Sequence, residues 1–512
     1  MDFLEPFPIE ITKIHTLDQN NLSKGSPSSA QSTIVQDLRK KTHFCKMSLN
    51  HKLKPGSVDG RNNMSRSSSV SKNSSINHSS TNSVAKNRSS SSIQDKDNEE
   101  YNNDDIDETD ESGQNILLGI VSQLKPGSDL SRITLPTFIL EKKSMLERVT
   151  NQLQQPDLIL QAHASSDPLE RFLGVVKWYL SGWHIAPKAV KKPLNPVLGE
   201  YFTCYWDLPN KQQAFYVSEQ TSHHPPKSSY FYMIPESNIR VDGVVFPKSK
   251  FLGNSSAAMM EGLGVVQFLD IIDPKTKKPE KYTFTQPNVY ARGILFGKMR
   301  IELGDHMIIK GPQYQVDIEF KTKGFISGTY DAIEGTVKDY SNKSYYEISG
   351  KWNDIMYIKG SKNGKKTVFL DVNKTHPLKP KVRPLSEQGE YESRKLWNKV
   401  LIALGKRDHK VATDEKFEIE EHQRLLAKKR EEDDVEFEPK LFRKSTNPND
   451  DLEYYVYKQI PATADKVEKV KSILEIAPVL PGQKFTERFQ IPAYKKHEIQ
   501  KQLLTENKKS NI

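Results

Sequence analysis

The chain has 512 residues, of which 75 are Lys or Arg and 65 are Asp or Glu, so its formal net charge is +10 at pH 7. This excess predicts attraction to anionic partners, either nucleic acid or the cytoplasmic face of a membrane, without choosing between them. Two cysteines, Cys45 and Cys204, exclude a disulfide framework and fit a reducing cytosol. We find no signal-peptide pattern and no apolar run of about eighteen residues, so we expect a soluble protein.

Residues 1–114 are predicted to form a disordered tail rather than a domain. Across residues 65–92, serine occupies 14 of 28 positions, and such a segment buries too little apolar surface to offset the entropy of ordering it. An acidic patch follows at 104–111, interpreted either as a solvated linker or as an electrostatic brake on binding to anionic membranes. Serines beside Arg66 and Arg88 are candidate phosphorylation sites, and added phosphates would oppose such binding.

An ordered domain is expected from residue 115 to about 505, followed by a flexible tail at 506–512. The run 116–121 has the spacing of a short amphipathic helix, and Pro126-Gly127 would end it. From the pattern alone, this is an amino-terminal helix with one apolar face.

The middle of the chain has the alternating pattern of half-buried strands. Apolar and polar residues alternate without a break across 314–321 and across 298–303, and Gly304-Asp305 is predicted to form a turn. Further strand-rich runs are predicted at 265–272, 281–285, 345–358 and 367–372. So many consecutive strands predict a large antiparallel sheet that curls toward closure. The alternation leaves open whether side chains fill the interior or leave a cavity.

A charged helix is predicted at 414–432, which contains no Gly or Pro. Within it Lys416, Glu420 and Arg424 are four residues apart and therefore lie on one face. Two interpretations are open. Glu420 forms a surface ladder with two cations, worth a few tenths of a kcal/mol per pair, or it holds both cations toward a polyanion.

The most unusual stretch is 219–226, with the sequence EQTSHHPP. Alternation along a strand would direct His223 and His224 to opposite faces, which disfavours a shared metal ion. Pro225 and Pro226 suit a strand end or a rim turn. A histidine pair at the mouth of a pocket can donate hydrogen bonds to an anion, most strongly once protonated. The alternative is a pair of structural histidines whose hydrogen bonds are satisfied.

This string resembles the signature of the oxysterol-binding-protein family of lipid-transfer proteins. Residues 191–200, KKPLNPVLGE, are similar to a second signature of the family, and the resemblance extends over about 116–499. Four further stretches point to one branch of the family: 135–140, 183–188, 250–255 and 301–306. That branch contains the short fungal homologues that exchange phosphatidylserine for phosphatidylinositol 4-phosphate.

The resemblance implies a mainly β protein with flanking helices, an α+β fold. Its centre would be a large incomplete antiparallel β-barrel enclosing a lipid tunnel, with an amino-terminal lid at about 115–142 and carboxy-terminal helical segments. The lipid-binding domain would cover 115–505. The lid would hide acyl chains from water and open at a membrane; the alternative is a helix that only packs on the core.

The resemblance also implies a headgroup site. The residues assigned to it are Lys192, Asn195, His223, His224, Lys416, Glu420 and Arg424. The cations would neutralise the phosphates of phosphatidylinositol 4-phosphate, and the histidines would donate to its distal phosphate, each contact worth about 1.5–3 kcal/mol. Phosphatidylserine would depend more on Lys192 and Asn195. Contacts to the lid and to phosphatidylserine are implied for Leu135, Thr137 and Ser249.

The implied function is cytosolic lipid transfer between the endoplasmic reticulum and the plasma membrane, in which phosphatidylserine is extracted and exchanged for phosphatidylinositol 4-phosphate. No catalysed reaction, cofactor or metal is expected. The alternative is a sterol and phosphatidylinositol 4-phosphate carrier, or a phosphoinositide sensor, of the same family. The expected partners are the two phospholipids, anionic membranes in transient contact, and a tether protein at contact sites. We expect a monomer that is peripheral at these contacts.

Other classes of protein fit less well. A hydrolase would pair Ser222 with His223, but adjacency in sequence is poor geometry for a nucleophile and its base, and no GxSxG elbow is present. No HExxH or CxxC pattern supports zinc. Residues 360–367 depart from Walker spacing and are interpreted as a hairpin loop. Nucleic-acid binding is the strongest rival on composition, yet no recognisable motif accompanies the basic charge.

Overall fold

The computed structural model describes residues 125–128, 136–187, 189–295, 298–323, 328–362 and 364–483. All of them belong to one compact unit, residues 87–512. The predicted tail at 1–114, the amphipathic helix at 116–121 and the end at 506–512 lie outside the described residues. Of the predicted lid, only 125–128 and 136–142 are described.

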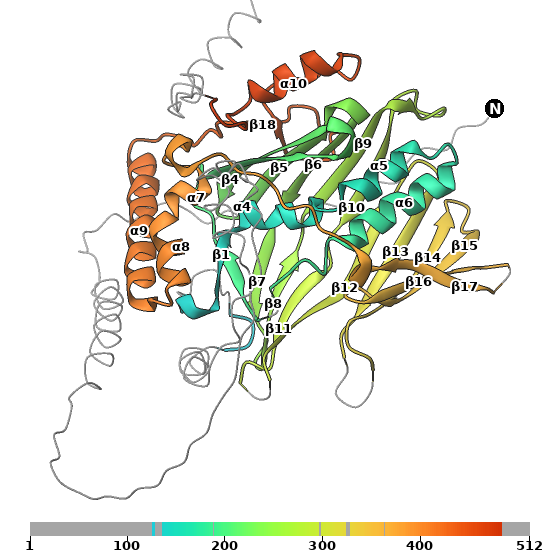
Figure 1. Cartoon of the computed structure of the whole chain (residues 1–512). Helices are drawn as coiled ribbons and strands as arrows, with labels where there is room; N and C mark the ends of the chain where they lie inside the picture. The colour runs from blue at the N-terminus through green and yellow to red at the C-terminus, as the bar shows by residue number, and fades with distance from the viewer. Residues whose placement is uncertain are drawn as a thin grey trace, which may run out of the picture. The chain divides into compact units, whose positions relative to one another are not determined.

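The fold is built on one 15-stranded sheet (Figure 1). Twelve of the strands form a continuous antiparallel path. In sheet order the path runs through β17 (Lys366–Asp371), β16 (Ile355–Gly360), β15 (Ser344–Lys351), β14 (Ala332–Asp339), β13 (Tyr314–Lys321), β12 (Arg300–Lys310), β10 (Pro279–Thr285), β9 (Leu263–Ile272), β6 (Ile239–Val245), β5 (Pro226–Ile234), β4 (Gln213–His223) and β3 (Tyr201–Asp207). In the described part of the chain β3 and β17 end this path without pairing to each other, so the predicted incomplete antiparallel barrel is confirmed.

Three more strands form a side branch of the sheet. They are β7 (Pro247–Phe251), β8 (Ser255–Met260) and β11 (Asn288–Arg292). Here β8 pairs with both β7 and β11, and β11 joins the branch to β12. In Figure 1 the branch lies below β4, β5 and β6.

The predicted strand runs are confirmed with small changes at their ends. The run 314–321 is β13 as predicted, and β9, β10 and β17 correspond to the runs at 265–272, 281–285 and 367–372. The single run at 345–358 is two strands, β15 and β16, separated by a tight turn at 352–354. The predicted hairpin loop at 360–367 joins β16 to β17.

The predicted turn at Gly304-Asp305 is wrong, because both residues lie inside β12. Asp305 has a left-handed φ of 65°, a conformation that Gly and Asp tolerate better than most residues. Before this point β12 pairs with β11, and from Asp305 onward it pairs with β13. The same backbone preference that favours a turn therefore serves here to bend a strand where it changes partners.

Two helices, α5 (Pro156–Ala164) and α6 (Pro168–Ser181), pack against one face of the sheet (Figure 1). Asp167 caps α6 by accepting hydrogen bonds from two backbone N–H groups, each at 2.8 Å. A Cβ on Gly174 would lie 2.6 Å from Cβ of Ala162, so the close approach of the two helices requires glycine. Buried residues of α6 join strand residues in the largest core cluster, each large side chain contributing about 1.5–3 kcal/mol.

A short connected segment precedes α5. It consists of a 3-10 turn, η2 (Thr137–Ile139), then β1 (Leu140–Ser144), α4 (Met145–Arg148) and a second 3-10 turn, η3 (Val149–Leu153). β1 pairs in parallel with β2 (Lys192–Leu194), which places the end of the predicted lid beside the KKPLNPVLGE signature.

The carboxy-terminal part is helical, as predicted. Its elements are α7 (Ser393–Leu396), α8 (Asn398–Gly405), α9 (His409–Glu432), β18 (Phe442–Lys444), β19 (Tyr454–Val456) and α10 (Lys466–Leu474). α9 begins earlier than predicted because Asp408 caps it, accepting from the N–H of Val411 at 3.0 Å. None of the helices in the described ranges has the length and apolar character needed to cross a bilayer.

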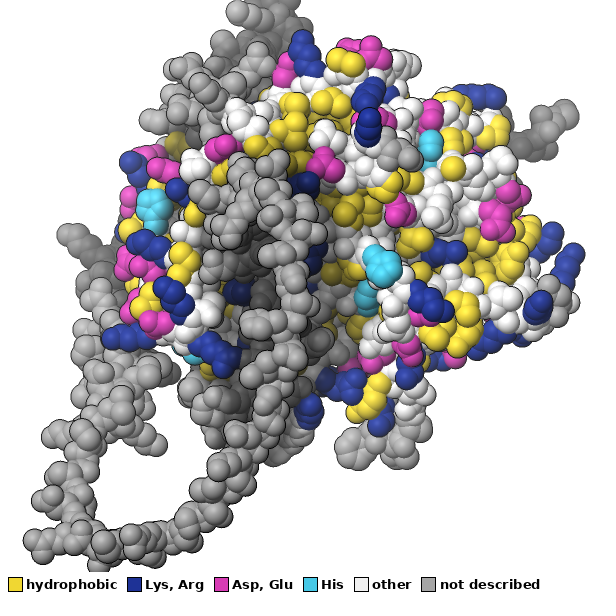
Figure 2. Space-filling view, in the orientation of Figure 1, with side chains coloured by type: hydrophobic (Ala, Val, Ile, Leu, Met, Phe, Trp, Pro, Cys, Tyr) yellow, Lys and Arg dark blue, Asp and Glu magenta, His cyan; other side chains and the backbone are white. Residues whose placement is uncertain are grey.

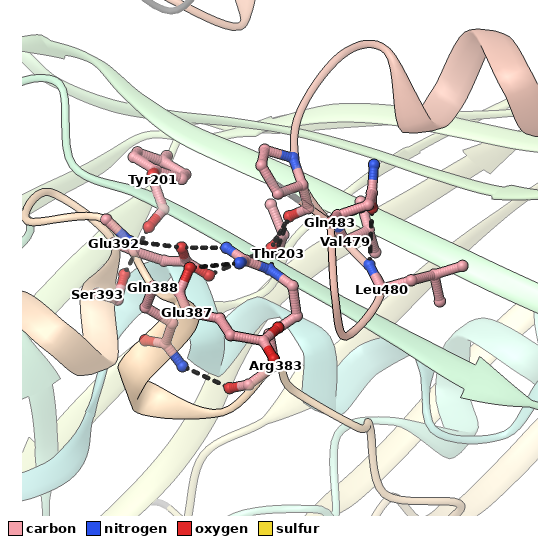
Figure 3. Close-up of polar contacts among 12 residues, drawn as sticks. Tyr201, Thr203, Arg383, Glu387, Gln388, Glu392, Ser393, Val479, Leu480 and Gln483 are labelled. Carbon is pink, nitrogen blue, oxygen red and sulfur yellow. Dashed lines mark hydrogen bonds and ion pairs between the residues drawn. The ribbon is translucent and has the colours of Figure 1, made fainter. Parts of the chain in front are cut away.

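A buried polar cluster fastens the carboxy-terminal segment to the sheet (Figure 3). Arg383 donates to Oε2 of Glu392 at 2.5 Å, and both side chains are fully buried. Arg383 also donates to the carbonyl of Pro478 at 3.1 Å, and Thr203 of β3 donates to the same carbonyl at 2.8 Å. Burial is the main cause that raises the pKa of Glu392 to about 7. The cluster joins β3, the segment before α7 and the chain after α10.

Candidate functional site

The two signature stretches lie side by side. The N–H of Gly199 donates to the carbonyl of Gln220 at 3.0 Å, and the N–H of Gln220 donates to the carbonyl of Glu200 at 2.8 Å. The end of KKPLNPVLGE is thereby paired with the EQTSHHPP strand, β4. Residues separated by about twenty positions in sequence therefore form one local structure.

Glu200 anchors the first signature. Its Oε1 accepts from the hydroxyls of Ser144 at 2.5 Å and Ser393 at 2.7 Å, and its Oε2 accepts from the indole of Trp397 at 2.9 Å and the N–H of Val197 at 3.0 Å. Burial raises the pKa of this carboxyl, and the four donors oppose that rise. The side chain is fully buried, so its role is to hold β1, α7 and the signature loop together.

Glu219 anchors the second signature in a similar way. Its two oxygens accept from the backbone N–H groups of Lys440 and Leu441, each at 2.7 Å. Burial raises the pKa of Glu219 to about 7, and the two backbone donors oppose the rise. The EQTSHHPP strand is thereby fastened to the segment that follows α9.

The two histidines lie where β4 ends. His223 is the last residue of the strand, and its ring is 4.6 Å from the ring of His224 in an edge-to-face arrangement. The expectation that they face opposite sides is wrong, because strand alternation stops at His223 and the turn brings the rings together. His224 is exposed, whereas His223 is partly buried. Within the described residues no group of three His, Cys, Asp or Glu side chains is arranged to hold a metal ion.

His223 is uncharged at neutral pH. Burial is the main cause that lowers its pKa to about 4, and the neighbouring His224 lowers it further. The expectation of donation from a protonated pair therefore does not hold for the free protein at this position. Nε2 of His223 lies 2.8 Å from Nε2 of Gln423 on α9, so α9 reaches the histidine pair.

The charged face of α9 matches the predicted spacing. Nζ of Lys416 donates to Oε1 of Glu420 at 2.5 Å, while Arg424 reaches Oε2 of Glu420 only at 3.7 Å and donates to Glu421 at 2.5 Å. The Lys416 side chain is 12% exposed and that of Arg424 is 52% exposed. Lys416 is thus held in place by Glu420, and Arg424 remains accessible to water. Acidic and basic side chains are interspersed over α9 in Figure 2.

Lys192, the first residue of β2, lies near this face of α9. Its side chain is exposed to water. Desolvation by neighbouring protein atoms is the main cause that lowers its pKa. The like charge of Lys416 lowers that pKa further and Glu420 opposes it. Asn195 is exposed in the loop that follows β2.

Thr137 joins η2 to the start of α9. Its hydroxyl donates to the carbonyl of His409 at 3.2 Å and lies 3.4 Å from the hydroxyl of Thr413. Lys191, next to Lys192, donates to the carbonyl of Phe138 at 2.5 Å. The last described part of the predicted lid is therefore held between α9 and the first signature.

Among the described residues, no contact joins Asn195 or Ser249 to the other predicted headgroup residues. Ser249 lies in β7, opposite Ala258 of β8. Leu135 lies outside the described residues. The structure thus brings together Lys192, His223, His224, Lys416, Glu420 and Arg424, with Thr137 at the end of the same helix.

Gln423 was not predicted from the sequence. Its Oε1 accepts from the N–H of Leu198 at 2.6 Å while its Nε2 faces His223, so it touches both signatures. It also borders a cavity of about 300 Å³ between α9 and the segments around Leu198 and Tyr391, lined mainly by apolar side chains. Its place beside Arg424 on a helix already predicted to face the site was the one signal available.

Comparisons with known proteins agree on one family. The family model described as "Oxysterol-binding protein" matches residues 119–402 and 401–466. Oxysterol-binding protein homolog 6 of Saccharomyces cerevisiae is 72% identical over 410 residues, covering 80% of this chain and 91% of that protein. Homolog 7 of the same yeast is 75% identical over 392 residues, covering 76% and 89%. A crystal structure of the Osh1 ORD domain in complex with ergosterol is similar with a TM-score of 0.57 and 26% identity, covering 68% of this chain and 88% of that one.

Proposed function

The chain belongs to the oxysterol-binding protein family, and we propose that it extracts phosphatidylserine and exchanges it for phosphatidylinositol 4-phosphate. Lipid binding and transfer is the function that the family and its solved structures support. The exchange of these two lipids is the finer proposal, and it follows from the resemblance to the short fungal branch. No bond in the lipid is broken in this process.

The observation that carries the proposal is the convergence of cations from separate elements. Lys192 on β2 and Lys416 on α9 lie close enough for each charge to act on the other, and Arg424 is on the same face of α9. Glu420 holds Lys416 in place. Glu420 and Glu421 offset part of the positive charge on α9, and the repulsion between Lys192 and Lys416 would be relieved by an anion bound between them. A phospholipid headgroup supplies that anion.

The two lipids would use the site differently. Phosphatidylinositol 4-phosphate carries two phosphates, and its distal phosphate would be bound by the histidine pair and Arg424. Phosphatidylserine has a smaller headgroup and would depend on Lys192 and Asn195, with Thr137 near the lid. Leu135 and Ser249 stay proposed contacts of phosphatidylserine. Each charge-assisted contact contributes about 1.5–3 kcal/mol.

Competition explains how exchange could be driven. If one cavity accepts one lipid at a time, each lipid displaces the other at the membrane where it is abundant. A gradient of phosphatidylinositol 4-phosphate between two membranes would then drive phosphatidylserine against its own gradient. We propose these membranes to be the endoplasmic reticulum and the plasma membrane, with a tether protein retaining this chain at their contacts.

A sterol is the second candidate ligand. It is favoured by the similarity to the Osh1 ORD domain, which was crystallised with ergosterol. A sterol carries no phosphate, so its uptake should not depend on the histidine pair. Lipid mass spectrometry of the protein purified from cells separates the candidates directly.

The proposal is tested by removing both imidazoles. His223→Ala with His224→Ala should abolish extraction of phosphatidylinositol 4-phosphate from vesicles while phosphatidylserine extraction persists. His306→Ala is the matched control, because His306 lies on β12, is 60% exposed and contacts Asp317 rather than the site. Undiminished extraction of the phosphoinositide by the double variant would refute the assigned site.

A further inference from the structure

Gln423 contacts both signature motifs through one side-chain amide. Oε1 lies 2.6 Å from the backbone nitrogen of Leu198, and Nε2 lies 2.8 Å from Nε2 of His223. The orientation of this amide determines which nitrogen of His223 carries the proton.

Leu198 fixes the orientation of the amide. A backbone N–H can only donate, so the side-chain atom facing it must be the amide oxygen. The amide nitrogen, which can only donate, therefore faces His223, and Nε2 of the imidazole must accept. A neutral imidazole that accepts at Nε2 carries its proton on Nδ1.

The surroundings of His223 keep the ring neutral. Burial and the adjacent His224 both disfavour the charged form, and on α9 the effects of Glu420 and Arg424 oppose each other. The ring therefore has one donor, the N–H at Nδ1. That atom is buried and makes no well-aligned hydrogen bond to the described residues. The backbone carbonyl of Pro196 is the acceptor nearest to the ring, and its weak interaction favours the charged form.

A buried donor whose nearest acceptor is poorly aligned is costly, and a ligand that supplies a better acceptor recovers part of that cost. We propose that Gln423 is a positioning residue that fixes His223 as the Nδ1–H tautomer, so that the ring offers this donor to a phosphate oxygen of a lipid headgroup. The identity of that headgroup rests on the proposed function. The assignment of the tautomer does not rest on the proposed function, because it follows from the contacts of Gln423 alone.

The tautomer is tested without lipid by nitrogen NMR on the full chain with ¹⁵N-labelled histidine, using His223→Ala to assign the signal. The expected result near neutral pH is a protonated Nδ1 and an unprotonated Nε2 at His223. A proton on Nε2, or a ring that titrates near the ordinary value of about 6.5, overturns the proposal. Because no lipid is present, this outcome is independent of whether the proposed exchange occurs.

Gln423→Glu tests the functional consequence. The variant keeps the acceptor for Leu198 but replaces the donor facing His223 with a second acceptor, which moves the proton to Nε2. We expect extraction of phosphatidylinositol 4-phosphate from vesicles to fall about tenfold at about pH 7.5, the effect of one lost hydrogen bond, with a smaller loss for phosphatidylserine. Toward about pH 5.5 the ring of the variant becomes doubly protonated, regains its Nδ1–H and recovers extraction.

The readout is the ratio of variant to wild type at each pH, because the phosphate itself titrates near pH 6. Gln315→Glu on β13, which contributes no residue to the site, introduces the same charge as a control. Equal losses for both lipids, or a ratio that does not change with pH, would show that Gln423 only supports the fold of the site.

Discussion

Glu219→Gln isolates the effect of a buried carboxyl on stability. Burial raises the pKa of Glu219 from 4.5 to about 7, so between these two pH values the folded chain binds a proton at this site that the unfolded chain does not. Stability therefore falls as pH rises through this window. With 1.36 kcal/mol for each pKa unit, the shift corresponds to a loss of about 3 kcal/mol between pH 4.5 and about 7.

The glutamine variant has no proton to gain or lose at this position. The NH2 group of the glutamine faces the backbone N–H of either Lys440 or Leu441, and two donors cannot hydrogen-bond to each other. This mismatch lowers the stability of the variant by the same amount at every pH. The difference in unfolding free energy, wild type minus variant, should therefore shrink by about 3 kcal/mol from pH 4.5 to about 7.

The assay is urea-induced unfolding followed by fluorescence across this pH range. Glu392, whose pKa burial also raises to about 7, is present in both proteins, so its contribution cancels in the difference. A difference that stays constant with pH, or that grows as pH rises, would contradict the assignment of a raised pKa to Glu219. Either result would mean that the carboxylate of Glu219 is stabilised by its two backbone donors rather than disfavoured by burial.

Two further predictions concern pairs of charged side chains, one of opposite charge and one of like charge. Arg383→Met leaves the buried Glu392 without its cation and should lower the free energy of unfolding by about 3–5 kcal/mol, measured by urea unfolding. Adding Glu392→Leu removes the uncompensated carboxylate and should restore part of the lost stability. Lys416→Met removes a like charge near Lys192, so the pKa of Lys192 should rise and extraction of phosphatidylinositol 4-phosphate should fall about tenfold. Amine labelling at increasing pH, read by mass spectrometry, follows Lys192, and an unchanged labelling profile would place the two ammonium groups too far apart to interact.

The sequence predicted the parts of the fold that depend on local pattern. The alternation at 314–321 is β13 without a change at either end, because one face of that strand is buried and the other is not. The alternation at 298–303 marked the same kind of strand but not its length, because β12 continues to Lys310 through Asp305. Whether a left-handed residue ends a strand or bends it depends on which strands lie beside it, and those neighbours are set by the whole sheet.

Part of the candidate site was likewise predictable from local pattern, and part was not. Charged residues at a helical spacing predicted the face of α9 that carries Lys416 and Glu420, since their chemistry is visible in their type. Gln423 was missed because an uncharged amide has no pattern of its own. Its role depends on the N–H of Leu198 and the ring of His223, and these come together only when α9 packs beside the paired signatures.

The two signatures contain residues of two different kinds. Glu200 and Glu219 are fully buried and accept hydrogen bonds only from the protein, so they cannot contact a headgroup. Lys192 and His224 are accessible to water within the same two stretches. A headgroup site that gathers cations needs such support, because mutual repulsion would otherwise separate the elements that carry them. Loss of lipid extraction in a signature variant therefore identifies a ligand contact only when the unfolding free energy is unchanged, as we expect for His224→Ala and not for Glu200→Gln.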